Sequence, residues 1–368
     1  MRDVLAERLL ARVMKWTPED VARERPDLQA LATYKYDEYQ QFSPGMRFVE
    51  SLARWLEQFE ADEERKKAYE FVRSRLIFVS EAEMAHLVTM SYPDVIRPFL
   101  ISQVALMKHI AEWYVTKIVE SPEFSILLRQ SMFLGLSDGS HIDIFRRSCS
   151  SDISHEQILR THEISSKRAR EMQQKLEEDL TSKLGRKPSK DEARFRIVFL
   201  LDDFSGSGIS YIRNGERGSE YEGKIAAFYY DHCVKKVDGL NLIDPSDVQV
   251  CLVLYMATNQ AYEYLQKYGR ELFGVIPFTV KVVNLLAESA KVNDQDNTEF
   301  IRTLSKYYDS SIETKSYLKG RHEKPYLGFD ECALPLVLSH NTPNNSVTLM
   351  WFEEHRKFHG LFPRISRF

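Results

Sequence analysis

The hydrophobic pattern of the chain changes near residue 130. Before this point apolar residues recur at helical spacing, as in the segment 48–59, and Ser80 followed by Glu83 has the spacing of a helix-capping box. After it, short continuous apolar runs alternate with amphipathic segments. The apolar runs predict strands buried on both faces at 132–136, 196–201, 248–255 and 277–283. The segments between them predict helices at 141–147, 224–236 and 258–272. Alternating strands and helices favour a parallel sheet wrapped by crossover helices.

The pattern therefore predicts an α/β protein with two domains. We expect a helical N-terminal domain over residues 1–128, followed over 129–368 by a doubly wound, mainly parallel sheet. A highly charged helical insertion is expected over 154–192, before the second strand. Such an insertion fits a lid over the carboxyl edge of the sheet, and the alternative is a solvated helix face with i,i+4 ion pairs.

Composition narrows the classes of function. The net charge of −4 gives no basic footprint for nucleic acid, and no apolar run approaches the roughly 20 residues of a membrane helix. Four scattered cysteines without a C-x-x-C pair favour a reducing cytoplasm over a disulfide framework or a zinc ribbon. His355 and His359 could share a helix face, but no carboxylate stands at a diagnostic spacing, so a zinc site is not predicted. We expect a cytoplasmic protein without a membrane partner and without a metal held directly by its own side chains.

The strongest candidate for a site follows the apolar run 196–201. The run ends at Asp202 and Asp203, a loop of serines and glycines spans 205–210, and a helical-looking segment comes next. In open α/β sheets ligands bind at the carboxyl ends of strands, and a helix beginning there would direct its N–H groups at an anion. The alternative is an ordinary strand-to-helix turn with an aspartate cap.

Two further polar segments follow apolar runs. The loop of Ser137, Asp138, Gly139 and Ser140 comes after 132–136, and its alternative interpretation is a tight Asp-Gly turn. The segment after 334–338 is rich in side chains that both donate and accept hydrogen bonds, and its alternative is an Asn/Pro turn. Its candidates for contact with a base or a sugar are Asn341, Thr342, Asn344 and Asn345. His340 in the same segment is a candidate for proton transfer near neutral pH.

The stretch 196–210 resembles the signature of the type I phosphoribosyltransferase fold, although Ile209 stands where that family usually has a small residue. The resemblance implies that Asp202 and Asp203 hold the ribose hydroxyls of phosphoribosyl pyrophosphate. Our candidate catalytic residues are these two carboxylates and His340. It assigns the 5′-phosphate to Ser205, Gly206, Ser207, Gly208 and Ser210. It assigns the pyrophosphate to the loop 137–140, where Asp138 would repel the ligand unless Mg²⁺ lay between them, so magnesium is expected to arrive with the substrate.

Over roughly residues 130–368 the chain is similar to phosphoribosyltransferase-like effector proteins of bacterial anti-phage, retron-type conflict systems. Two hypotheses follow from this resemblance. In the first, the protein is an enzyme that transfers a phosphoribosyl group or cleaves the glycosidic bond of a nucleotide. In the second, it is a non-catalytic module that senses a ribose phosphate or nucleotide and regulates a partner. That partner would be a protein or a nucleoprotein, such as a reverse transcriptase with its DNA or RNA, and a homo-oligomer is left open.

Overall fold

The computed structural model describes residues 3–160, 164–215, 221–234, 242–315, 317–354 and 356–365. The contacts within the chain form two compact units. One unit is residues 84–286, and the other combines residues 1–83 with 287–368. The sequence pattern instead places a boundary between 128 and 129. The contact-based division differs because the C-terminal segment packs with the N-terminal helices.

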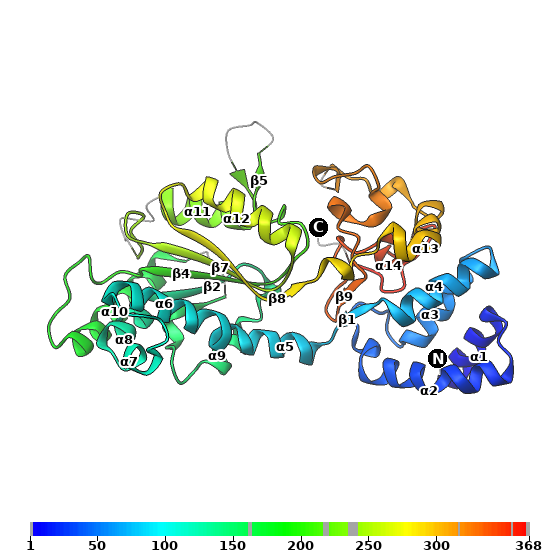
Figure 1. Cartoon of the computed structure of the whole chain (residues 1–368), viewed down its shortest axis with the longest axis horizontal. Helices are drawn as coiled ribbons and strands as arrows, with labels where there is room; N and C mark the ends of the chain where they lie inside the picture. The colour runs from blue at the N-terminus through cyan, green and yellow to red at the C-terminus, as the bar shows by residue number, and fades with distance from the viewer. Residues whose placement is uncertain are drawn as a thin grey trace. The chain divides into compact units, whose positions relative to one another are not determined.

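The unit of residues 84–286 contains a five-stranded sheet in the order β3-β2-β4-β7-β8, and every neighbouring pair is parallel (Figure 1). The strands are β2 (Ser131–Gly135), β3 (Ile158–Leu159), β4 (Ile197–Ser205), β7 (Gln249–Thr258) and β8 (Phe278–Leu286). Four of them correspond to the predicted apolar runs, while the two-residue β3 was not predicted. The α/β class with a mainly parallel sheet and N-terminal helices is confirmed.

Helices cover both faces of this sheet, as a doubly wound fold requires. The helices are α6 (Arg97–Lys108), α7 (Val115–Val119), α8 (Pro122–Arg129), α9 (Ile142–Ser148), α10 (Ser166–Leu184), α11 (Lys224–Tyr229) and α12 (Asn259–Phe273). On one face Phe133 and Phe199 stack on each other and meet Phe99 of α6 and Phe145 of α9. On the opposite face alternate strand residues form one apolar cluster with α10, α11 and α12. In Figure 1, α11 and α12 run along one side of the strands while α6 and α9 lie along the other.

Helix α10 differs from the lid expected in the insertion 154–192. Its apolar stripe, which includes Met172, Leu176 and Leu180, is buried in the same cluster as the sheet. The helix lies between β3 and β4 in the chain and packs on one face of the sheet. Because its apolar side chains are buried there, it is part of the core and is not a lid over the carboxyl edge.

The segment after the 205–210 loop also differs from its prediction. No helix begins there; a single turn at 209–211 leads to β5 (Arg213–Asn214), which pairs with β6 (Tyr221–Glu222). Helix α11 begins only at Lys224. The helix N-terminus expected to face an anion directly after the loop is therefore absent from the described residues 205–215.

The other unit combines N-terminal helices with the C-terminal segment. Its longer elements are α1 (Asp3–Met14), α2 (Pro18–Tyr34), α3 (Phe48–Glu57), α4 (Asp62–Ser74) and α13 (Asp294–Lys306), with the short α14 (Thr348–Trp351). Strand β1 (Ile77–Val79) pairs in parallel with β9 (Leu336–Leu338), which joins the two ends of the chain in one small sheet. Helix α5 (Glu81–Met90) follows the predicted capping box, in which Ser80 and Glu83 exchange hydrogen bonds of 2.8 and 3.1 Å. No helix in the described parts of either unit is long and apolar enough to cross a bilayer.

Candidate functional site

The site predicted from the sequence lies at the topological switch point of the five-stranded sheet. In this sheet β2 and β4 are neighbours. The connection after β2 leads to β3 on one side, and the connection after β4 leads to β7 on the other side, so the switch point lies between β2 and β4. In open parallel sheets this arrangement leaves a crevice at the carboxyl ends of the two strands. The loop 136–140 follows β2, and the pair Asp202–Asp203 lies near the end of β4, directly after Leu201, which pairs with the last residue of β2, so both lie at that edge.

Direct contacts join these two segments. The Leu136 amide donates to the carbonyl of Leu201 at 3.0 Å, and Ser137 Oγ donates to Asp202 Oδ1 at 2.5 Å. The backbone of Gly139 passes so close to the second carboxylate that a Cβ there would overlap Asp203 Oδ2. Only glycine can occupy this position without displacing that carboxylate. The structure thus brings together the loop and the acidic pair that the sequence singled out separately.

Asp202 is completely buried and receives three hydrogen bonds. Besides Ser137, Tyr211 Oη donates at 2.7 Å and Lys224 Nζ at 2.5 Å. Burial raises the pKa of Asp202, and the charge of Asp203 adds to this, while the Lys224 ammonium opposes it. Burial also raises the pKa of Tyr211 well above its usual value, so the phenol keeps its proton and remains a donor. Asp202 is therefore the internal anchor of the site, and the half-buried Asp203 is the carboxylate nearer the surface.

Lys224 was not predicted to belong to the site. It opens α11, 22 residues beyond Asp202, and its ammonium also lies 4.8 Å from the centre of the Tyr211 ring. The sequence offered one usable signal, a lysine at the start of a predicted helix that follows the acidic strand. This signal was not sufficient, because the length of the segment with β5 and β6 does not predict where the start of α11 lies relative to the end of β4.

Two serine side chains of the loop 205–210 accept hydrogen bonds from amides of the same loop. Ser205 Oγ accepts from the Gly208 amide at 3.1 Å, and Ser207 Oγ accepts from the Ile209 amide at 3.4 Å. Gly208 has φ +83°, and a Cβ there would lie 2.7 Å from Cδ1 of Tyr264. Ser205, Gly206, Ser207 and Gly208 are buried, and Ser210 is exposed. The loop in this conformation has its glycine packed against an aromatic ring, and its assignment to a 5′-phosphate stays a prediction.

Two side chains of β7 donate hydrogen bonds to the backbone of the 136–140 loop and of the 205–210 loop. Tyr255 is completely buried, and its hydroxyl donates to the carbonyl of Ser140 at 2.7 Å. Thr258 donates to the carbonyl of Gly206 at 2.6 Å and caps α12 by accepting from the amide of Ala261 at 3.0 Å. These two residues hold the loops in place, and neither is presented at the surface.

The third predicted segment belongs to the other unit. His340 lies in the turn after β9, and its carbonyl accepts from Gln41 Nε2 at 2.7 Å. Asn341 and Asn345 donate to backbone carbonyls, and the hydroxyl of the buried Thr342 donates to the Phe362 carbonyl at 2.9 Å. The expectation that this segment follows a strand is confirmed. Since β9 pairs with β1, that strand is not part of the five-stranded sheet, and the roles of His340, Asn341, Thr342, Asn344 and Asn345 stay predictions.

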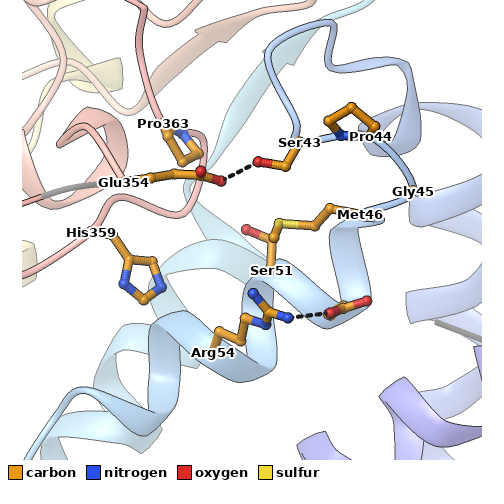
Figure 2. A pocket seen from close by; sticks show the side chains of 10 residues that line it. Ser43, Pro44, Gly45, Met46, Ser51, Arg54, Glu354, His359 and Pro363 are labelled. Atoms are coloured by element: carbon orange, nitrogen blue, oxygen red, sulfur yellow. Dashed lines mark hydrogen bonds and ion pairs between the residues drawn. The ribbon is translucent and has the colours of Figure 1, made fainter.

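A cavity of about 500 Å³ lies within the unit that contains the termini (Figure 2). Ser43 Oγ donates to Glu354 Oε1 at 2.8 Å across it, and Arg54 pairs with Glu50 at 2.7 Å. Burial lowers the pKa of His359 on its wall, and His355 lies outside the described residues. The lining of this cavity includes none of the residues predicted from the sequence to bind a ligand.

Among the described residues no three His, Cys, Asp or Glu side chains are grouped as a metal site would require. The side chains at the switch point that could ligate a metal do so through oxygen atoms, and they include the half-buried carboxylate of Asp203 and the carboxylate of Asp138. Mg²⁺ commonly uses one or two protein carboxylates together with substrate phosphates. This donor set is therefore compatible with magnesium brought by a phosphorylated ligand.

The fold, an α/β fold with a mainly parallel five-stranded sheet, is consistent with the phosphoribosyltransferase-like class. The model of the PRTase-CE family matches residues 52–364, and the chain belongs to this family. The match extends into the N-terminal helices, beyond the residues 130–368 over which the sequence motifs carried the resemblance. Searches of the curated proteins and of the solved structures find no match.

Proposed function

We propose that the protein binds the phosphoribosyl group of a ribose phosphate or nucleotide at the switch point and acts at its anomeric carbon. The observation that carries the proposal is the convergence of the 136–140 loop with Asp202 and Asp203 at the carboxyl edge of a parallel sheet. Membership of a phosphoribosyltransferase-like family supports it independently.

Each residue has a distinct part in this proposal. Asp203 accepts hydrogen bonds from the ribose hydroxyls, because it is the less buried of the two carboxylates. Asp202 keeps the 137–140 loop and Lys224 in position through its three hydrogen bonds. Magnesium, when bound with the ligand, would neutralise the leaving pyrophosphate. In the two predicted phosphate loops Gly139 is half-buried and Ser210 is exposed, so a ligand could reach both.

The first test is binding. Phosphoribosyl pyrophosphate with Mg²⁺ is titrated calorimetrically into the full chain and into Asp203→Asn. We expect the variant to bind at least about tenfold more weakly, because a charge-assisted hydrogen bond contributes roughly 1.5–3 kcal/mol. Asp143→Asn is the matched control, since that carboxylate is exposed and pairs with Arg147 in the same helix. Equal affinity for the wild type and Asp203→Asn would exclude the proposed role of this carboxylate.

A non-catalytic sensor is the second candidate, and specific observations favour it. Asp202 is already satisfied by three internal donors, and the serines of the 205–210 loop accept from that loop's own amides. Turnover separates the two candidates. Exchange of labelled pyrophosphate into phosphoribosyl pyrophosphate, or loss of a nucleotide, supports an enzyme, whereas binding without either supports a sensor.

The cellular role we propose is that of an effector in a bacterial anti-phage system of the retron type. The resemblance of residues 130–368 to such effectors supports this role. Its partner would be a protein or a nucleoprotein, such as a reverse transcriptase with its nucleic acid. Phage plating on cells with the wild-type gene and with Asp203→Asn tests it, and equal plating would argue against a role of this site in defence.

A further inference from the structure

A cleft in the unit of residues 84–286 lies at the amino ends of the sheet strands, whereas the switch point lies at their carboxyl ends. Its volume is about 680 Å³, within the range of small-molecule sites. Arg129 ends α8 two residues before β2 begins, and Gln157 directly precedes β3, so the cleft is at the amino ends of these strands. Strand β2 has five residues and separates it from the 136–140 loop by roughly 17 Å at about 3.3 Å per residue.

Arg129 is the unusual group in this cleft. Its side chain is only 5% exposed, and its Nε donates to Asp179 Oδ2 at 2.7 Å. The other two guanidinium nitrogens, Nη1 and Nη2, are buried and have no hydrogen-bond partner among the described residues. Leaving two donors of a charged group unpaired inside a protein is unfavourable, and native structures rarely retain such groups without a partner. The pair of free nitrogens forms the fork that binds two oxygens of one anion.

The surrounding charges also favour an anion. Arg97 and Lys183 line the cleft, and within the described residues no carboxylate forms an ion pair with either of them; Lys183 Nζ donates to the neutral Ser125 hydroxyl at 2.6 Å. The two acids of the lining are already engaged. Asp179 accepts from Arg129, and Asp152 accepts from the Tyr92 hydroxyl at 2.9 Å.

We propose that this cleft binds the phosphoryl group of a small phosphorylated molecule. Arg129 Nη1 and Nη2 donate to two of its oxygens, and Arg97 and Lys183 supply the remaining positive charge. These three cations outnumber the two carboxylates of the lining, Asp152 and Asp179, and the planar guanidinium of Arg129 matches two phosphoryl oxygens. Because Nη1 and Nη2 are buried, binding includes a side-chain rearrangement in the wall of the cleft. This site is separate from the switch point and does not depend on the function proposed there.

Inorganic phosphate is the probe for the test, and its binding to the full chain is followed by ³¹P NMR line broadening and by thermal shift. We expect the affinity for phosphate to fall at least about tenfold in Arg129→Gln and about threefold in Lys183→Gln. Lys187→Gln, an exposed lysine just beyond the same helix, is the matched control and should bind as the wild type does. A loss of phosphate affinity in Arg129→Gln distinguishes this site from the switch point, because the five residues of β2 separate the two.

Three outcomes would overturn the proposal. The first is that acetate at equal ionic strength binds as well as phosphate, which indicates a carboxylate site. The second is unchanged phosphate affinity in Arg129→Gln with a native circular dichroism spectrum, which indicates that only water satisfies Nη1 and Nη2. If Arg129→Gln does not fold, Lys183→Gln and Arg97→Gln decide, and the third outcome is that both bind phosphate as tightly as Lys187→Gln.

Discussion

Replacing Lys224 by methionine tests whether the buried carboxylate of Asp202 depends on its ammonium partner. Methionine keeps most of the apolar stem and removes the charge that lies 2.5 Å from Asp202 Oδ2. Removing one partner of a buried ion pair costs about 3–5 kcal/mol. Since the Lys224 side chain is 32% exposed and water can replace part of its charge, we take about 3 kcal/mol for neutral pH.

The predicted penalty depends on pH with a definite sign. Burial raises the pKa of Asp202 in the folded protein, so the folded state holds this proton more tightly than the unfolded chain does. Stability from this group is therefore present at low pH and is lost as the pH rises through the folded pKa. Without Lys224 the pKa rises further and the loss grows. Protonating the carboxylate costs about 1.4 kcal/mol per pH unit above its ordinary value of 3.8. At pH 4.5 the penalty is thus limited to about 1 kcal/mol.

The assay is thermal unfolding of the full chain at pH 4.5 and 7.5, with the transition of residues 84–286 analysed separately because two units need not unfold together. At pH 7.5 we expect that transition to fall by roughly 6–12 °C, since about 1 kcal/mol shifts a domain of this size by 2–4 °C. Lys267→Met is the matched control, because its ammonium lies the same 4.8 Å from a tyrosine ring, that of Tyr268. A shift that is equal at both pH values, or no larger than that of the control, would refute the role given to Lys224.

Two further changes test a hydrogen bond below the 136–140 loop and the packing of α12 on β8. Tyr255→Phe removes the hydrogen bond to the Ser140 carbonyl, and we expect a loss of about 1–2 kcal/mol in denaturant unfolding, because a buried acceptor is left unpaired; an unchanged midpoint would show that water or another donor replaces the phenol. Gly269→Ala would make a Cβ overlap Cε1 of Phe278, where α12 packs on β8. We expect about 1–3 kcal/mol of destabilisation from this overpacking, measured by the same method, and a stabilised variant would contradict the packing described for that helix.

The buried strands and the acidic end of β4 were predictable from the sequence because each depends on local pattern. The runs around Val198 and Leu252 are continuous and apolar, as strands covered on both faces must be. The carboxyl ends of parallel strands necessarily meet at one edge of the sheet. For this reason the 137–140 loop and Asp202 could both be assigned to that edge from the sequence alone.

The features that were missed depend on contacts between distant parts of the chain. Strand β3 has two residues and no pattern of its own, and the pairing of Ile77 with Leu336 joins segments from opposite ends of the chain. The contact between Lys224 and Asp202 depends on how the segment with β5 and β6 folds between them. The length of that segment alone does not predict where Lys224 lies. The His340 segment follows a strand as predicted, but which sheet that strand joins is decided by tertiary packing.

The central claim is that the carboxyl edge between β2 and β4 receives a phosphoribosyl group. A crystal structure of the full chain grown with phosphoribosyl pyrophosphate and Mg²⁺ tests it most directly. We predict ligand density between the 136–140 loop and the end of β4, with the ribose hydroxyls in contact with Asp203. Density confined to the Arg129 cleft, or an empty switch point at saturating ligand, would contradict the claim.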